Sequence, residues 1–377
     1  MRNKNTLPLE IYSVNNIVGF VPQSEQFDDA GYLRNTDTSI YMIVPPKHFA
    51  YNPARIDIGS IGYQYLDHDV QVSSLYEVFK TSDSVDDDFL WIWFHTSYFN
   101  HTVKRLQEGG VRLYFYYDKM QETKIGLPSL VEQQKIASLF TELDALIQSA
   151  EKELEGYREL KQGMLQKMFP KKGEKVPEIR FPEFTDDWEQ CKLGDVTEFI
   201  RNGLNYKSDG DRNYRYKITR IESISTGKIN IEKLGSSETI NKSYKLREGD
   251  ILFSHINSLP YIGNTAIYNA KFGEIYHGMN LLNIRVNQAI VFPYFLIHLL
   301  KRETSRRYFK IVAKQAVNQA SISITDVEMF GFLIPTLEEQ KKIGEYFSNL
   351  DNLIALQQKE LDGYKELKKG LLQQMFC

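Results

Sequence analysis

The densest cluster of side chains that could bind a ligand is basic. The stretch 301–314 holds six Lys or Arg residues and one acidic residue. On a single helix, steps of four would place Arg302, Arg306, Lys310 and Lys314 on one positive face. Such a face neutralises phosphates and attracts a polyanion, although a solvated surface helix would show the same charges. The candidates for DNA contact in this stretch are Arg302, Arg306, Arg307 and Lys310.

A second stretch, 201–220, interleaves basic and amide side chains with tyrosines. Arg pairs with guanine edges, Asn pairs with adenine edges and Tyr hydroxyls bond phosphates, so this mixture suits groove reading. A polar, turn-rich loop with buried tyrosines would look the same. The candidates here are Arg201, Asn202, Lys207, Arg212, Arg215 and Lys217. Those in the first half of the chain are Asn52, Arg55, Lys104 and Arg105.

Motifs for catalysis are missing from the sequence. There is no GxxxxGK[ST] loop, no HExxH and no paired-cysteine zinc spacing. Asn52-Pro53 continues as Ala54-Arg55, which is not the Asn-Pro-Pro-aromatic motif of amino-methyltransferases. The seven histidines follow no ligand spacing. We therefore predict no catalytic residue, no metal ligand and no cofactor in this chain.

Composition limits the remaining possibilities. The formal net charge is −3, so any basic footprint must be local. The two cysteines, Cys191 and Cys377, match no disulfide framework, which fits a reducing cytoplasm. No apolar stretch is long enough to span a bilayer, and the amino terminus lacks a signal-peptide core. We expect a cytoplasmic protein that does not bind membranes.

An internal repeat organises the chain. The segment 128–169 aligns without a gap to 335–376, which lies 207 positions later, and about 24 of 42 positions are identical. Each copy opens with a capping box, Ser129 with Glu132 and Thr336 with Glu339. Apolar residues then recur at alternating steps of four and three, as in a coiled coil. Each copy is therefore predicted to be one long helix with a coiled-coil seam.

The identity between the two copies extends beyond the seam. A helix pair that packed only on itself would constrain the seam positions alone, so we infer that the same external partner docks on each copy. The predicted partner-binding residues are Glu132, Gln133, Lys135, Glu339, Gln340 and Lys342.

The rest of the chain forms two globular parts. Short runs of Tyr, Ile, Phe and Val, broken by Gly, Asn and Pro, predict β-rich domains with helical insertions, an α+β fold. A weak likeness between 49–63 and 251–268 suggests that the domain is duplicated. The predicted boundaries are a first domain at 1–127, a helix at 128–169, a linker at 170–187, a second domain at 188–334 and a second helix at 335–377.

Two repeated phrases resemble a known family. P-x-L-x-E-Q-x-K-I at 128–136 and 335–343, and G-Y-x-E-L-K-x-G at 156–163 and 363–370, resemble the helical regions of type I restriction-modification specificity subunits. The phrase IRFPEFTDDWEQCKLGD at 179–195 looks like that family's usual opening of a target recognition domain. The resemblance covers essentially the whole chain.

The resemblance implies two target recognition domains that each read half of a split, asymmetric site in double-stranded DNA. It implies that two antiparallel coiled-coil helices space the domains, with a pseudo-twofold repeat. It also implies two modification subunits as partners, which carry S-adenosylmethionine and the adenine chemistry, and restriction subunits that hydrolyse ATP. The chain itself would need no cofactor.

The first domain departs from the family pattern, because no W-x-x-x-K-L-G-D opening precedes it and Met1 falls inside the expected domain. Two other classes of function stay open. One is a structural coiled-coil adaptor without DNA affinity, which charge reversal on the basic helix would separate from the DNA-reading hypothesis. The other is a self-sufficient methyltransferase or nuclease, which the missing motifs disfavour.

Overall fold

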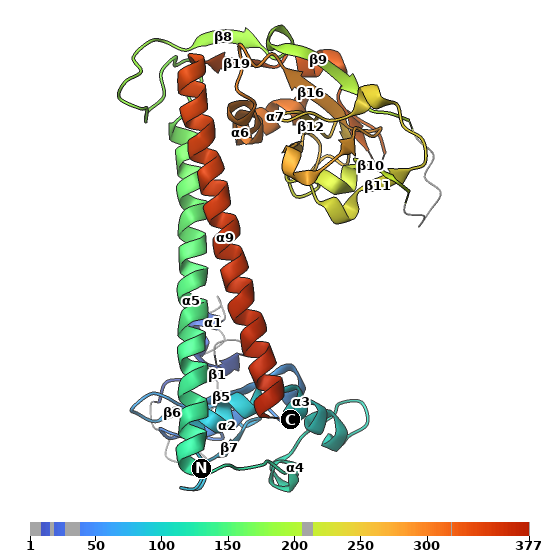
Figure 1. Ribbon diagram of the computed structural model, residues 1–377. Coiled ribbons are helices and arrows are strands. Elements are labelled where there is room, and N and C mark those ends of the chain that lie inside the picture. The colour runs from blue at the N-terminus through green and yellow to red at the C-terminus, as the bar shows by residue number, and fades with distance from the viewer. Residues whose placement is uncertain (1–8, 16–18, 27–37, 206–213, 318, 377) are drawn as a thin grey trace. The chain divides into compact units, whose positions relative to one another are not determined.

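The structure is a computed structural model that describes residues 9–15, 19–26, 38–205, 214–317 and 319–376 (Figure 1). Its contacts divide the chain into two compact units. The first unit is 1–152 together with 359–377, and the second unit is 153–358. Each unit therefore contains one globular part and a portion of each of two long helices.

The globular part of the first unit is built mainly from short antiparallel strands. The sheets are β1 with β2, β3 with β6, and β5-β4-β7. The strands are β1 Tyr12–Asn15, β2 Gly19–Pro22, β3 Met42–Val44, β4 Phe49–Tyr51, β5 Ile61–Tyr63, β6 Val70–Val72 and β7 Glu77–Phe79. The helices are α1 Gln23–Gln26, α2 Asp87–Phe94, α3 Ser97–Leu106 and α4 Tyr117–Glu122.

The globular part of the second unit is larger. Its sheets have the orders β14-β12-β16-β9, β11-β10-β15, β13-β18-β17 and β19-β8. The first strands are β8 Glu189–Lys192, β9 Thr197–Asn202, β10 Tyr216–Ile218, β11 Gly235–Ser237, β12 Ile251–Phe253 and β13 Ile256–Asn257. The later strands are β14 Thr265–Ile267, β15 Ile275–Tyr276, β16 Leu282–Val286, β17 Lys314–Gln315, β18 Ala320–Ser321 and β19 Gly331–Ile334. The helices are α6 Pro293–Lys301, α7 Glu303–Val312 and α8 Ile324–Glu328.

The two repeated segments form long helices, α5 Leu130–Lys167 and α9 Leu337–Met375. The predicted caps are present, because the amides of Glu132 and Glu339 donate to the hydroxyls of Ser129 and Thr336 at 3.4 Å. The predicted seam is buried or half-buried along both helices, with the exception of Met375, which is exposed. Its positions on α5 and just beyond are Ile136, Phe140, Leu143, Ile147, Ala150, Leu154, Tyr157, Lys161, Met164 and Met168, and those on α9 are Ile343, Phe347, Leu350, Ile354, Gln357, Leu361, Tyr364, Lys368, Leu371 and Met375. The α+β fold and the coiled-coil helices are therefore confirmed.

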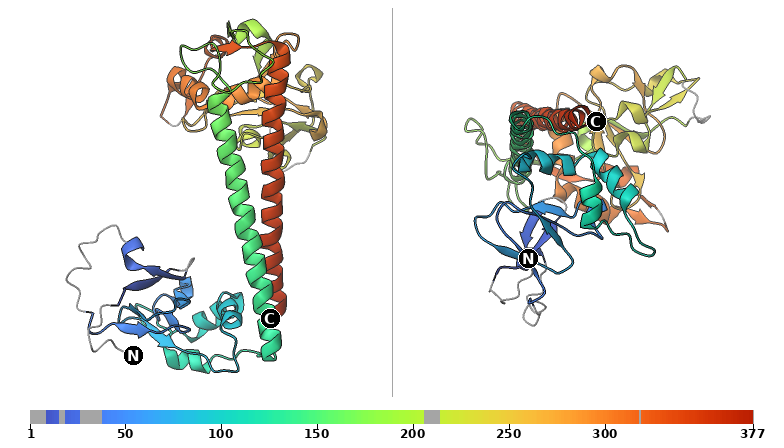
Figure 2. Two further views of the ribbon diagram at one scale, coloured as in Figure 1. Left: turned by 90° about the vertical axis from the view of Figure 1, so that its left-hand side faces the viewer. Right: turned by 90° about the horizontal axis from the view of Figure 1, so that it is seen from below.

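In each unit the portions of α5 and α9 run side by side and antiparallel (Figures 1 and 2). In the first unit, Lys365 pairs with Glu151 at 2.7 Å. In the second unit, Arg158 donates to the side-chain oxygen of Gln358 at 2.9 Å. These two contacts are equivalent under the 207-residue repeat, since Glu151 corresponds to Gln358 and Arg158 to Lys365. The helix pair is thus a pseudo-twofold repeat.

The last phenylalanine of each repeat joins the two helices to the adjacent globular part. In the first unit, the ring of Phe376 lies 5.1 Å from that of Phe89 and 6.2 Å from that of Phe140. In the second unit, Phe169 lies 5.5 Å from Phe295 and 6.1 Å from Phe347, which are the equivalent positions. Both joints bury aromatic area, the strongest apolar contribution that a few residues can make.

The globular parts share a core motif, which agrees with the suggested duplication. The antiparallel pair β4 and β5 matches the pair β12 and β14. The helix pair α2 and α3 matches α6 and α7, which begin 206 positions later. Val103 of α3 and Phe309 of α7 are fully buried at equivalent positions. Both helices end alike, with the amides of Gln107 and Ala313 donating to the carbonyls of those two residues.

Candidate functional site

The basic stretch 301–314 is not one helix, so the predicted single positive face is wrong. Helix α6 ends at Lys301, Arg302 is extended at the N-cap of α7, and Lys314 belongs to strand β17. Of the four residues at steps of four, Arg306 and Lys310 alone lie on α7. At the break Arg302 adopts φ −61° and ψ 149°, which lies outside the α-helical region.

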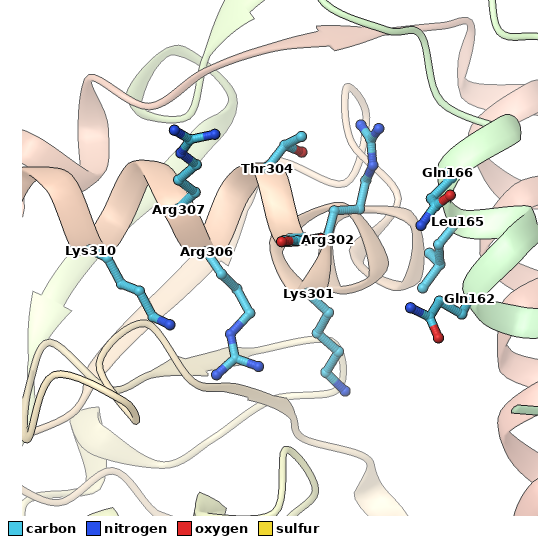
Figure 3. A pocket seen from close by; sticks show the side chains of 10 residues that line it. Gln162, Leu165, Gln166, Lys301, Arg302, Thr304, Arg306, Arg307 and Lys310 are labelled. Atoms are coloured by element: carbon cyan, nitrogen blue, oxygen red, sulfur yellow. The ribbon is translucent and has the colours of Figure 1, made fainter. Parts of the chain in front are cut away.

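The break creates a cavity of about 620 Å³ between the end of α5 and the helices α6 and α7 (Figure 3). Arg306 and Lys310 point to one side of α7, whereas Arg307 points to the opposite side. The basic residues that line the cavity are Lys301, Arg302, Arg306, Arg307 and Lys310. The structure therefore brings together all four candidates of this stretch, and adds Lys301.

Two of these cations are held in place by the protein itself. Burial lowers the pKa of Lys301 to about 8, and its ammonium donates to the carbonyl of Gly227 at 2.9 Å. Burial likewise lowers the pKa of Arg302 to about 10, and its guanidinium lies 4.7 Å from the centre of the Phe169 ring. In both groups burial disfavours the charged form.

The three remaining cations differ in whether they already form hydrogen bonds within the protein. Arg306 donates to the side-chain oxygen of Asn264 at 2.9 Å, and its Nε is buried without a partner among the described residues. Arg307 and Lys310 are exposed and make no side-chain hydrogen bond or ion pair within the described part of the chain. Arg307 and Lys310 are consequently the candidates best placed for an external phosphate.

The described candidates of the second stretch, 201–220, lie on several different elements. Arg201 at the end of β9 donates to the carbonyl of Ser243 at 2.5 Å and lies 4.7 Å over the Tyr244 ring, so its charge serves the domain's own packing. Asn202 and Arg215 are exposed. Lys217 is half-buried on β10. Lys207 and Arg212 lie outside the described residues.

In the first unit, the four candidates fall in two places. Asn52 and Arg55 line a cavity of about 430 Å³ beside β1 and β4, and the side chain of Asn52 accepts a hydrogen bond from the amide of Ala54. Lys104 and Arg105 are exposed in the last turn of α3. Lys104 occupies the position that Lys310 has on α7, 206 residues later.

Three predicted partner-binding residues are buried, so the expectation that they lie on an outer face is wrong. The side chain of Gln133 donates to the carbonyls of Pro128 and Ser84 and accepts from the amide of Asp86. Gln340 makes the same three bonds to Pro335, Ile290 and Phe292. Each glutamine therefore fastens the start of its long helix to a loop of its own globular part, because a buried amide needs internal partners.

The third buried residue, Glu339, is covered by the segment before the second domain. Arg180 donates two bonds of 2.8 Å to its carboxylate, a bidentate pair. Lys342 pairs with Glu183 from the same segment. The predicted linker 170–187 thus packs on the start of α9. Glu132 and Lys135, which correspond to Glu339 and Lys342, are exposed.

The long helices carry exposed leucines on one flank. If the seam positions Phe140 and Ile147 are heptad positions a, the residues before them are positions g. Several of these positions, and of their equivalents on α9, hold leucines that are between 41% and 52% exposed. They are Leu139, Leu146, Leu160, Leu353 and Leu367. Leu139, Leu146 and Leu367 belong to the first unit, and Leu160 and Leu353 to the second.

The opposite flank of the helix pair is polar. Glu151, Arg158, Gln358 and Lys365 are at positions e and contact one another across the seam. In an antiparallel pair position e faces e and position g faces g, so the leucines share the other flank. Each unit therefore presents exposed leucines on one flank, which we call the leucine flank. The polar residues at position g on this flank are Glu153, Lys167, Glu360 and Gln374.

The described residues hold no group of three His, Cys, Asp or Glu side chains arranged to bind a metal ion. None of the described helices is both long and apolar enough to cross a membrane. Sequence reasoning missed Lys301, the leucine flank and the glutamine joints. The repeat itself contained a signal for the glutamines and the leucines, since Gln133 matches Gln340 and Leu146 matches Leu353, whereas the position equivalent to Lys301 is His95.

The geometry defines a duplicated α+β protein in which each copy places exposed basic side chains at the end of one helix, on a coiled-coil frame. A family profile for the type I restriction modification DNA specificity domain matches residues 42–156 and 185–364. The chain belongs to this family.

Two similar proteins are named as specificity subunits of type I restriction enzymes. A protein of Methanocaldococcus jannaschii named as the MjaX type I restriction enzyme specificity subunit is 44% identical over 209 residues, which is 54% of this chain and 49% of that protein. The chain thus spans about half the length of this relative. The MjaVIII specificity subunit of the same organism is 26% identical over 365 residues, 90% of this chain and 82% of that protein.

Solved structures share the fold. The crystal structure of a type I restriction-modification S subunit from M. genitalium matches with a TM-score of 0.60 and 14% identity, over 99% of this chain and 89% of that one. A chain from a study of complex assembly in a type I R-M system matches with a TM-score of 0.54 and 17% identity, over 99% and 96%. These two matches show that the chain shares the fold of those proteins.

Proposed function

We propose that this chain reads a two-part site in double-stranded DNA, one half with each globular part, and holds two modification subunits in place. The observation that carries the proposal is the duplication, which repeats a basic helix end in each globular part and a leucine flank in each portion of the helix pair. A protein that read one continuous site would need no second copy of either.

The DNA contacts proposed are electrostatic and local. Lys104 and Lys310 occupy equivalent positions, and both are exposed. Arg307 adds a second exposed charge, on the side of α7 opposite to Lys310. Contacts of this kind neutralise phosphates and set the register of the protein on the duplex without reading its sequence.

The protein partners are proposed to dock on the leucine flank. Leucines exposed at one heptad position of both helices form a discontinuous apolar strip that a further helix can contact, as in a four-helix bundle. The strip occurs once per unit, so two copies of one modification subunit fit the repeat. Those subunits would supply S-adenosylmethionine and the methyl transfer, and restriction subunits would join the same cytoplasmic complex.

The experiment that tests the proposal is long-read mapping of methylated adenines in a host that expresses the matching modification subunit, with and without this chain. A single split motif that appears only with the chain is the expected result. No new methylation, despite a stable complex with the modification subunit, would instead favour the coiled-coil adaptor. Methylation by the isolated chain would revive the self-sufficient enzyme.

A further inference from the structure

Each globular part carries a short hairpin directly after its equivalent helix. After α3, Glu108 and Tyr114 exchange both backbone hydrogen bonds, at 2.9 and 2.8 Å. After α7, strands β17 and β18 pair Lys314 with Ser321 and Gln315 with Ala320, and β18 also pairs with β13 in a three-stranded sheet. One residue separates each helix from its hairpin, Gln107 in the first unit and Ala313 in the second.

Both hairpins return to the core at the same place. The amide of Phe115 donates to the carbonyl of Pro53 at 2.9 Å, two residues after strand β4. The amide of Ile322 donates to the carbonyl of His255 at 2.8 Å, two residues after the equivalent strand β12. Phe115 and Ile322 are both buried. Each hairpin therefore projects from a base that packing fixes.

The tips of the hairpins share one feature, a fully exposed valine. Val111 is 105% exposed and Val317 is 98% exposed, and they lie 206 positions apart, as do Lys104 and Lys310. A single exposed apolar side chain needs no explanation, but the same one at equivalent tips of two duplicated domains does. The first tip is also sterically defined, because Gly109 has φ +138° and an added Cβ would lie 2.0 Å from the carbonyl oxygen of Arg112.

We propose that these two hairpins are the base-reading elements, one for each half of the DNA site. This inference rests on the proposed function and assigns its specificity-determining residues. The major groove admits a two-stranded β-ribbon, and apolar side chains there contact the methyl group of thymine. Val111 and Val317 would each make that contact, while Lys104 and Lys310, one helical turn before the hairpins, bind flanking phosphates.

The polar residues around the valines differ between the hairpins. The second hairpin carries Gln315 and Gln319, whose amides match an adenine edge, whereas the first carries Arg112, which matches a guanine edge. All three are exposed. The two half-sites should therefore each contain a thymine read by valine and differ at the neighbouring base pairs, which makes the whole site asymmetric.

The test uses the full chain in complex with its modification subunit. Methylated adenines are mapped for the wild type and for Val111→Ala and Val317→Ala. Leu75→Ala in the first unit and Ile231→Ala in the second are matched controls, since both side chains are exposed and lie away from the hairpins. We expect Val111→Ala to relax one half of the motif, Val317→Ala to relax the other, and the controls to leave it unchanged.

The contact itself is tested by binding titrations on duplexes in which uracil replaces the thymine of one half-site, which removes a single methyl group. The wild type should bind such a duplex about fourfold more weakly, the factor expected for one buried methyl group. The matching valine variant should be indifferent to the replacement.

Three outcomes overturn the inference. Valine variants that keep the wild-type motif and affinity would show that the tips do not read bases. Valine variants that lose the modification subunit, measured by co-purification, would make the tips protein contacts instead. A wild-type complex that produces no motif at all would remove the proposed function, and the inference with it, whereas the first two outcomes leave that function intact.

Discussion

The ammonium of Lys161 on α5 donates a hydrogen bond of 2.6 Å to the carboxylate of Asp351 on α9. The first unit contains the equivalent contact with the two helices interchanged: Lys368 on α9 donates to Asp144 on α5 at 2.5 Å. Both lysines occupy seam positions that apolar residues fill elsewhere along the helices. A lysine in the seam pairs well only in one register, so these two contacts fix the alignment of the antiparallel helices.

Removing one partner of this contact should therefore destabilise the second unit. Asp351→Asn leaves the mostly buried Lys161 without its counter-ion, and we expect a loss of about 2 kcal/mol in the free energy of unfolding. Urea unfolding measures the loss. Lys171→Ala, which breaks a surface pair with Glu178, is the control and should change stability by less than about 0.5 kcal/mol. An equal effect of both changes would contradict the role of the seam lysine.

The hydrogen bonds of the buried Gln133 and Gln340, which we call the glutamine joints, should contribute more to the free energy of unfolding than those of a surface glutamine. Gln340→Ala removes three hydrogen bonds and leaves the amide of Phe292 and the carbonyl of Ile290 without this partner, at a cost of about 3 kcal/mol. Gln133→Ala should act in the same way in the first unit. The exposed Gln134 supplies the control, and thermal unfolding of the three variants is the measurement. A Gln340→Ala protein as stable as Gln134→Ala would exclude the joint as a stabilising contact.

Buried histidines should make the second unit sensitive to acid. Burial lowers the pKa of His298 to about 3, and the pKa values of His255 and His277 to about 4. Near His298, Asp351 opposes this shift, while Lys161 and Lys301 reinforce it. Because all three folded-state pKa values are lowered, the unfolded chain binds protons first.

Stability from these histidines is therefore complete above about pH 6.5 and falls between that pH and about 4, by up to about 1.4 kcal/mol per pH unit for each histidine. His298→Phe should reduce the slope of unfolding free energy against pH by one proton. Urea unfolding at several pH values between 4 and 7 provides the slope. A variant with the wild-type slope would show that His298 is protonated in the folded protein.

Phosphate contacts should appear in the salt dependence of DNA binding. Lys310→Ala and Lys104→Ala should each reduce the slope of log affinity against log salt concentration by about 0.9, the value for one phosphate. Fluorescence anisotropy with a duplex that contains the mapped site gives this slope. Lys271→Ala, an exposed lysine outside the proposed interface, is the control and should leave the slope unchanged.

The leucine flank predicts a separation between stability and partner binding. Leu146→Glu and Leu353→Glu place a charge on an already exposed position, so the fold should be retained, while binding of the modification subunit weakens at least about tenfold. Leu356→Glu is the matched control, because Leu356 is 65% exposed but lies off this flank. Calorimetric titration compares the three. Equal weakening by all three would assign the effect to charge alone.

Much of this architecture follows from the sequence because local signals repeat. The capping residues Ser129 and Thr336 mark the starts of the long helices, and the alternating apolar spacing gives their seam. Two near-identical copies also show that the chain is duplicated. These properties depend on residues close together in sequence, so a single sequence is sufficient to find them.

Only the tertiary structure decided which side chains are buried and which are exposed when their sequence patterns are alike. Gln133 and Glu132 are neighbours in a polar segment that both repeats share, yet Gln133 is buried and Glu132 is exposed. Arg306 and Arg307 are adjacent arginines, of which one bonds Asn264 and the other is exposed. The exposed tips at Val111 and Val317 carry no mark in sequence either. Burial depends on residues distant in the chain, and short-range patterns contain no information about those neighbours.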